Sequence, residues 1–371
     1  MEKGRIKEVF PGGNTSQGFF SFYDYIAPSD ATRIMIIKGG PGVGKSSFMR
    51  AIAAEVNGYG YDVELHHCSS DNNSLDGVVF PQIKVALIDG TSPHVVDPRN
   101  PGAVDEIIHL GDYWDEKGMR QGREKILELN KAVGRLFGRA YRYLKAAKVI
   151  HDDLESIYSE SMDTGLANQK TADLMETIFE GSPVARKTGA IRKLFASAIT
   201  PDGYRNFLPS IFKSSPAIYA ITGAAGTGKS TLIQKLANAA VERGFDCEAY
   251  YCALDPSKIE HLVIEKLGVA VTTAEPPHRI DLDKAVSVVS MDECIAPGVP
   301  DEYRQPIAYN LKMKAELLET AIACLLEAKL THDQMEQYYI PNMNFQAISV
   351  LQEKTLRRIL KYAEEQALVS C

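Results

Sequence analysis

The feature that most constrains the fold of this chain is an internal duplication of its sequence. Residues of the first half match residues of the second half at an almost constant spacing, as in the pairs Lys45 and Lys229, Gly60 and Gly244, Cys68 and Cys252, and Asp71 and Asp255. This period is far longer than that of solenoid repeats, so it indicates the duplication of a whole domain. We predict a first unit at residues 1–195 and a second at residues 196–371, divided close to the turn-forming sequence at 200–203.

Both units have the same expected order of elements. A short apolar strand leads into a Gly-rich loop and then into a helix with apolar residues at every fourth position. A second strand, a short helix and a third strand follow. The three strands are expected at residues 33–38, 63–68 and 84–88 in the first unit, and at 217–222, 247–252 and 268–272 in the second. Strands alternating with helices predict an α/β fold with a parallel sheet covered on both faces.

After the third strand, each unit is expected to become helical. Residues 122–158 and 311–339 keep the apolar period of an α-helix, which predicts a long helical appendage to each α/β core. Equivalent polar residues share one face of each helix: His151, Glu155 and Tyr158 in the first, and His332, Glu336 and Tyr339 in the second. We interpret both sets as packed polar seams rather than ligand sites.

Two segments fit the phosphate-loop pattern G-x-x-x-x-G-K-[ST], at residues 39–46 and 223–230. The glycines allow backbone angles that turn consecutive N–H groups toward phosphate oxygens. The loop leads into a helix N-terminus, whose free N–H groups favour an anion. Lys45 and Lys229 are then expected to reach the β- and γ-phosphates, and the hydroxyls of Ser46 and Ser230 to ligate Mg²⁺. The residues predicted to bind nucleotide are Gly39, Gly40, Gly42, Val43, Gly44, Lys45, Ser46, Ser47, Gly223, Ala225, Gly226, Thr227, Gly228, Lys229, Ser230 and Thr231.

A triphosphate site also needs a carboxylate at a strand end to hold the Mg²⁺ shell. Asp89 follows the third strand of the first unit and is predicted to fill this role. The second unit has Thr273 at that place, so Asp292, after a later strand, is a possible substitute. Asp71 and Asp255 follow the second strand of each unit. A carboxylate there either acts as a catalytic base, holds Mg²⁺ or caps a helix.

Other polar residues have two interpretations each. His94 and His278 are expected either to contact a phosphate or a substrate, or to form hydrogen bonds within their own loop. The basic cluster of Arg186, Lys187, Arg192 and Lys193 forms either a solvated face, which we favour, or a lid on phosphates. A metal site at the adjacent His66, His67 and Cys68 is disfavoured, because the second unit has tyrosines in place of the histidines.

The two loops resemble those of the P-loop NTPase superfamily. The stretches at 68–77 and 89–98 make the chain similar to a bacterial family of tandem P-loop proteins described as ATPases or ATP-binding proteins. This resemblance covers nearly the whole chain and implies binding of ATP and Mg²⁺. Thr273 departs from the pattern, which puts hydrolysis by the second unit in question.

The charge and composition narrow the partners. A formal net charge of -7 gives no general attraction to nucleic acid or to an anionic membrane. Because apolar runs are short and six cysteines do not form a disulfide framework, we expect a cytoplasmic protein with reduced thiols. The leading expectation is an ATPase or ATP-driven switch. The alternatives are a small-molecule or nucleotide kinase with Asp71 as the base, and a non-catalytic scaffold whose helical arms bind a protein partner; the oligomeric state stays open.

Overall fold

The computed structural model describes residues 2–92, 95–278 and 280–369, and it contains two six-stranded mixed sheets. The first sheet has the order β1 (Ile6–Val9), β5 (Val63–His67), β6 (Leu75–Phe80), β7 (Val85–Asp89), β4 (Arg33–Lys38) and β8 (Asp105–His109). The second has the order β9 (Ile191–Leu194), β13 (Cys247–Tyr251), β14 (Ile259–Ile264), β15 (Val269–Thr273), β12 (Ala217–Thr222) and β16 (Ser287–Ser290). The order of equivalent strands is therefore the same in both sheets.

The expected short helix between the second and third strands is wrong. Its place is taken by β6 and β14, which run antiparallel to both of their neighbours, while the other strand pairs are parallel. Residues 75–80 are all buried, and a short continuous buried run favours a central strand over an amphipathic helix. The sheets are therefore mostly parallel rather than wholly parallel.

Each sheet is covered by helices on one face. Helix α1 (Lys45–Gly58) packs on β5 and β6, and α6 (Lys229–Glu242) packs on β13 and β14. The opposite face of the first sheet is covered by the segment around Tyr23 and Ile26, and that of the second by the short helix α5 (Leu208–Ile211). Two small hairpins lie between the sheets: β2 (Gly12–Thr15) with β3 (Gly18–Ser21), and β10 (Ser197–Thr200) with β11 (Gly203–Asn206).

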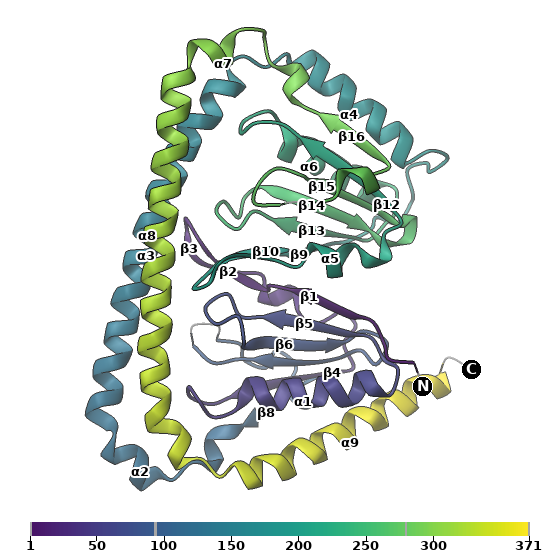
Figure 1. The fold of residues 1–371 in the computed structure, drawn as a ribbon. Coiled ribbons are helices and arrows are strands. Elements are labelled where there is room, and N and C mark those ends of the chain that lie inside the picture. The colour runs from purple at the N-terminus through teal and green to yellow at the C-terminus, as the bar shows by residue number, and fades with distance from the viewer. Residues whose placement is uncertain (1, 93–94, 279, 370–371) are drawn as a thin grey trace.

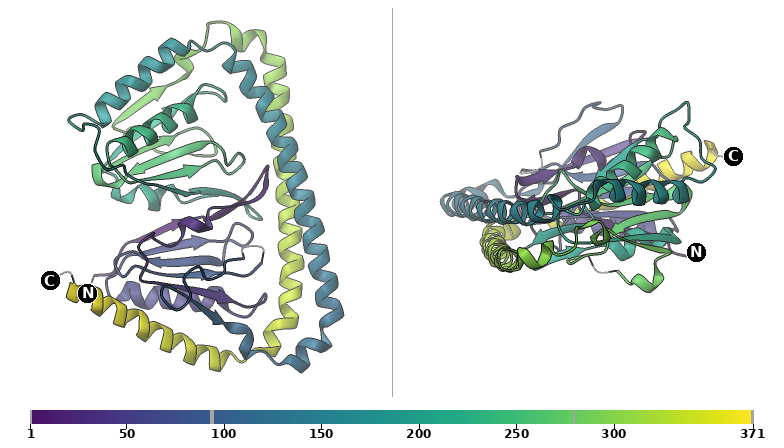
Figure 2. Two further views of the ribbon diagram at one scale, coloured as in Figure 1. Left: turned by 180° about the vertical axis from the view of Figure 1, so that it is seen from behind. Right: turned by 90° about the horizontal axis from the view of Figure 1, so that it is seen from above.

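Two long helices lie side by side along one edge of the molecule (Figures 1 and 2). These are α3 (Arg123–Ser159), which follows the short α2 (Glu116–Gln121), and α8 (Arg304–Tyr339), which follows α7 (Val299–Glu302). Small residues such as Ala140 and Ala321 are fully buried where the two helices pack together, which allows the helices to approach closely. None of the helices in the described part of the chain has the length and apolarity needed to cross a membrane.

The long helices exchange arms between the two copies. Helix α3 leads from the first sheet to α4 (Thr164–Ile178), which packs on α6 of the second core. Helix α8 leads back from the second sheet to α9 (Phe345–Val369), which packs on α1 of the first core. Figure 1 shows α4 over one core and α9 under the other. The expectation that each appendage belongs to its own core is thus wrong, because each core is completed by the arm of the other copy.

The two sheets meet edge to edge. The backbones of Phe10 and Phe195, which follow the edge strands β1 and β9, exchange two hydrogen bonds of 2.9 and 3.0 Å. Strand β9 lies before the expected boundary at residues 195–196 but belongs to the second sheet, so the second copy starts earlier than the turn sequence at 200–203 suggests. That turn forms the tip of the β10–β11 hairpin.

Candidate functional site

The first phosphate loop connects β4 to α1 in the way the sequence predicts. Gly42 and Gly44 have φ angles of 64° and 89°, in the left-handed region that glycine tolerates best, and α1 begins at Lys45. The Lys45 ammonium folds back and donates to the carbonyl oxygens of Gly39 and Gly40 at 2.9 and 2.8 Å. The glycines and the start of the helix therefore lie where the loop pattern predicts them, and anion binding by the loop stays a prediction.

The second loop repeats this geometry between β12 and α6. Gly226 and Gly228 have φ angles of 80° and 82°, and α6 begins at Lys229. The Lys229 ammonium donates to the carbonyl oxygens of Gly223 and Ala224 at 2.5 and 2.6 Å. Burial lowers the pKa of Lys229, although nearby carboxylates, Glu275 first among them, act in the opposite direction.

The other predicted loop residues lie in the core, in a contact that ties the helix to the sheet, or at the surface. Val43 is buried in the core, and the buried Thr227 hydroxyl donates to the carbonyl oxygen of Ala224. The Ser46 hydroxyl accepts a hydrogen bond from the backbone N–H of Leu75 at 3.0 Å, which ties α1 to the start of β6. Ser47 and Thr231 lie exposed in the first turn of their helices, and Ala225 and Ser230 are partly buried.

Asp89 lies beside the first loop, as its position after a strand next to β4 predicts. Its carboxylate is 3.6 Å from the Lys45 ammonium and accepts a hydrogen bond from the backbone N–H of Thr91. The Thr91 hydroxyl in turn donates to the carbonyl oxygen of Gly39. Burial raises the pKa of Asp89 even though the charge of Lys45 opposes this effect. An anionic oxygen at this position suits the outer shell of a phosphate-bound Mg²⁺.

A second carboxylate near the first loop was missed. The pairing of β5 with β6 shifts register at His66 and His67, so that Asp76 forms a β-bulge beside the end of β7. Burial, followed by the charge of Asp89, raises the pKa of Asp76 to about 7. Two acids thus lie close to one lysine. The signal in the sequence was one aspartate, Asp76, within an apolar run. That run is the segment that was expected to form the short helix.

The second loop has a different set of acids. Thr273 ends β15 with no carboxylate, as expected. The predicted substitute Asp292 reaches the loop, where it accepts a hydrogen bond from the backbone N–H of Ala224 at 2.7 Å. Glu275, which the sequence analysis did not select, accepts from the backbone N–H of Gly223 at 3.0 Å. Carboxylate oxygens therefore already bind backbone N–H groups at the start of this loop.

Asp71 and Asp255 take part in turns rather than in helix caps. The Asp71 carboxylate accepts from the Ser74 hydroxyl at 2.7 Å, and that of Asp255 accepts from the Ser257 hydroxyl at 2.6 Å. Each also lies near an arm lysine, at 3.7 Å from Lys329 and 3.2 Å from Lys148 respectively. These hydrogen bonds stabilise the turns that lead from β5 to β6 and from β13 to β14. A role as catalytic base for Asp71 stays a prediction.

The end of each long helix rests on the phosphate loop of the other copy. The Glu336 carboxylate accepts a hydrogen bond from the backbone N–H of Gly42 at 3.1 Å. A Cβ atom at Gly40 would lie 2.5 Å from the Tyr339 ring, and one at Gly226 would lie 2.2 Å from the Glu155 carbonyl oxygen. Only glycine fits at these contacts. The polar seams predicted on the helices are therefore the surfaces that contact the loops.

The predicted histidines and basic residues have mixed outcomes. His94 lies outside the described residues, and His278 is buried with its Nε2 2.8 Å from a Glu260 oxygen. Nε2 of His67 lies 3.1 Å from a Glu8 carboxylate oxygen. The solvated face expected for the basic cluster is wrong for Arg192, which lies between the two cores.

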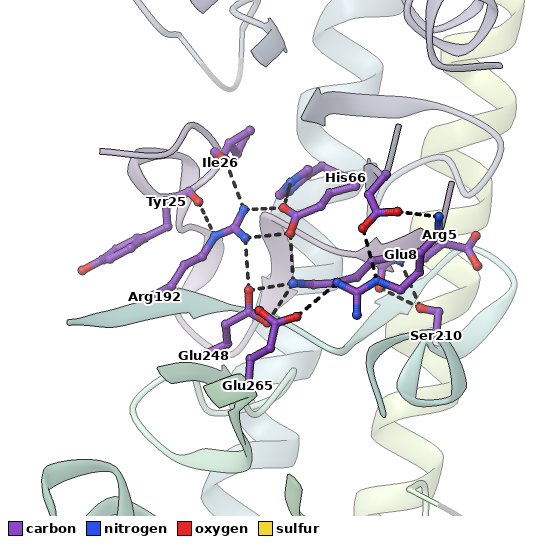
Figure 3. A network of polar contacts seen from close by, with 12 residues as sticks. Arg5, Glu8, Tyr25, Ile26, His66, Arg192, Ser210, Glu248 and Glu265 are labelled. Carbon is purple, nitrogen blue, oxygen red and sulfur yellow. Dashed lines mark hydrogen bonds and ion pairs between the residues drawn. The ribbon is translucent and has the colours of Figure 1, made fainter. Parts of the chain in front are cut away.

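Arg192 lies in a central charge network with Lys7, Glu64 and Glu248. Figure 3 shows this region, with Arg192 and Glu248 labelled. The Arg192 guanidinium donates to both glutamates, at 2.7 Å to Glu64 and 3.1 Å to Glu248, and the Lys7 ammonium contacts them at 3.0 and 2.6 Å. Lys7 and Arg192 lie at equivalent positions of the edge strands β1 and β9. Their partners Glu64 and Glu248 lie at equivalent positions of the neighbouring strands β5 and β13. The network therefore joins the two copies about their pseudo-twofold axis.

Comparison with known proteins adds no assignment: no protein-family model matches the chain, and no curated protein or solved structure matches it significantly.

Proposed function

We propose that this chain binds ATP with Mg²⁺ at both phosphate loops, hydrolyses it slowly, and uses the bound state to move its helical arms. The observation that carries the proposal is the contact of each loop with the arm of the other copy. A triphosphate on the first loop needs the backbone N–H of Gly42, which now binds Glu336. A bound triphosphate and the Glu336 side chain of α8 therefore compete for the N–H group of Gly42.

The loop residues have defined roles in this proposal. Lys45 and Lys229 give up loop carbonyl contacts and take phosphate oxygens instead, which are better partners for an ammonium because they are charged. Ser46 and Ser230 supply hydroxyls for Mg²⁺. Mg²⁺ near Asp89 and Asp76 favours the ionised form of both, because a bound cation is the largest local charge.

The two sites are expected to differ in turnover. The first has Asp89 at 3.6 Å from its lysine, whereas the second has Thr273 at the equivalent position. In the second site, Glu275 and Asp292 occupy backbone N–H groups of the loop. Hydrolysis should therefore depend mainly on the first site, and the second should hold nucleotide for longer.

The binding test uses calorimetry with ATP and Mg²⁺ on the full chain and on the Lys45→Ala and Lys229→Ala variants. Each variant should lose binding at its own site by about 1.5–3 kcal/mol, the cost of a charge-assisted contact. Two unaltered sites in the double variant would overturn the proposal. Phosphate release should need Mg²⁺ and fall more in Lys45→Ala than in Lys229→Ala. The reverse order would contradict the assigned asymmetry.

Labelled ATP separates hydrolysis from phosphoryl transfer. The protein is incubated with it alone and then with a pool of nucleotides and small metabolites. Release of phosphate from ATP alone supports an ATPase. Label on an acceptor, with negligible free phosphate in its absence, would identify a kinase, and tight nucleotide without turnover in either case would identify a scaffold.

A further inference from the structure

The second copy carries a buried cluster of metal-ligating groups that the nucleotide chemistry does not use. Glu260 and His261 come from β14 and His278 from the connection after β15, and one ligand atom from each lies within 4.8 Å of the other two. Both histidines are fully buried, and their ring centroids are 4.6 Å apart. We propose that these three residues bind one divalent transition-metal ion of the zinc class.

A backbone irregularity brings the cluster together. Neighbouring residues of a strand normally point to opposite faces of the sheet, so Glu260 and His261 would diverge. The pairing of β13 with β14 shifts register between Tyr250 and Tyr251, which leaves Glu260 as the extra residue of a β-bulge. Bulges change the direction of a side chain in this way. Here the bulge allows the carboxylate and the imidazole to meet His278 together.

The hydrogen bonds around His261 prepare it as a ligand. The Thr272 hydroxyl lies 2.7 Å from Nδ1 of His261 and 3.2 Å from the carbonyl oxygen of Thr273. When the hydroxyl donates to Thr273, its oxygen accepts from Nδ1, and Nε2 of His261 then carries the lone pair. Nε2 is buried and has no hydrogen-bond partner among the residues that the structure describes. A hydrogen bond that fixes the tautomer of a ring is the usual support of a metal-bound histidine.

The neighbouring groups agree with this assignment. His278 lies 2.8 Å from the Glu260 carboxylate through Nε2, and its buried Nδ1 has no hydrogen-bond partner within the described part of the chain. Two imidazoles and one carboxylate suit zinc and related ions, whereas Mg²⁺ prefers oxygen ligands alone. This site is therefore chemically distinct from a Mg²⁺ site on the phosphate loops.

The duplication predicts how many ions bind. In the first copy, Asp76 and Gly77 occupy the bulge positions that Glu260 and His261 occupy in the second. Glycine supplies no side-chain ligand, so the first copy lacks the second imidazole. The expected stoichiometry is one ion per chain, bound beside the second sheet.

The test is a zinc titration of the chelator-treated full chain against a competing indicator, with metal content measured by mass spectrometry. We expect one tightly bound zinc ion and a rise in Tm on its addition. The His261→Gln and His278→Gln variants should bind zinc more than about 100-fold more weakly. Thr272→Val keeps all three ligands and removes only the support of His261, so it should weaken binding by about 10–100-fold. The exposed His109, paired with Asp112, supplies the matched control His109→Ala, which should bind zinc as the unaltered chain does.

Cobalt gives a readout that does not depend on affinity. The Co²⁺-loaded chain should show visible absorption typical of nitrogen and oxygen ligands, and His261→Gln should lose it. Circular dichroism of each variant confirms that it folds, and Thr272→Val decides the question if the glutamine variants do not. Zinc binding that is unchanged in Thr272→Val and in a folded His261→Gln variant would overturn the proposal, as would the absence of stoichiometric zinc in the unaltered chain.

Discussion

Replacing Glu336 by Gln should tighten ATP binding at the first phosphate loop. In the absence of nucleotide, the Glu336 carboxylate accepts a hydrogen bond from the Gly42 N–H at 3.1 Å, and this side chain is 31% exposed. A hydrogen bond to a charged group contributes about 1.5–3 kcal/mol and a neutral one about 0.5–1.5 kcal/mol. Because Glu336 is partly exposed, its hydrogen bond is expected at the lower end of the range for charged groups. Replacing the charged acceptor by a neutral one therefore weakens the contact with which ATP competes by about 1 kcal/mol. The expected gain in affinity is about fivefold.

The assay is calorimetric titration with ATP and Mg²⁺ in a Lys229→Ala background, so that only the first loop is measured. Glu155→Gln is the matched control, because the Glu155 carboxylate binds Lys258 rather than a loop N–H. It should leave the first loop unchanged. Unchanged or weaker ATP binding in Glu336→Gln would refute the reasoning. Weaker binding would mean that Glu336 contacts the bound nucleotide or its Mg²⁺ instead of competing with it.

Further predictions concern the joints between the copies and the first-site acid. Arg192→Ala should destabilise the fold by about 3–5 kcal/mol in urea unfolding, because it leaves the buried Glu64 and the partly buried Glu248 with less compensation, and a loss below 1 kcal/mol would contradict this. Burial favours protonation of Glu64 and Glu248, but Arg192 and Lys7 outweigh it and lower the pKa of both. The stability they contribute should therefore be present above about pH 4.3 and disappear as the pH falls further, whereas a flat acid profile would exclude it. Ile359→Ala in α9 should cost about 2–5 kcal/mol, since Ile359 is fully buried in the first core, and unfolding that leaves this core unaffected would contradict the arm exchange. Asp89→Asn should lower phosphate release while ATP is still retained, and unchanged release would remove Asp89 from the reaction.

Short-range patterns in the sequence were sufficient for the loops. Each phosphate loop is defined by consecutive residues, and its glycines, its lysine and the helix that follows appear where the pattern predicts them. The position of Asp89 beside the loop follows as well, because parallel strands end at one edge of a sheet. The duplication is equally a property of the sequence, and both sheets have the same strand order.

The bulged residues were outside the reach of these patterns. Asp76 and Glu260 depend on a register shift between two paired strands. A register is decided by pairing partners and by which face is buried, so it cannot be derived from the local residue types alone. For the same reason, β6 and β14 were mistaken for short helices.

The exchange of arms was decided only by the tertiary structure. The apolar period of α3 and α8 predicts that each helix has a buried face, but it does not identify the partner. The partners are each other, and each helix then extends to the far core, where α9 buries Ile348 and Ile359. Charge patterns have the same limit, since Arg192 is one of a basic cluster in the sequence, and it becomes a partly buried joint only when the edges of the two sheets meet. The sequence by itself determined the position and backbone form of the two glycine-rich loops, whereas the long-range burial of apolar and charged side chains determined which copy each arm completes.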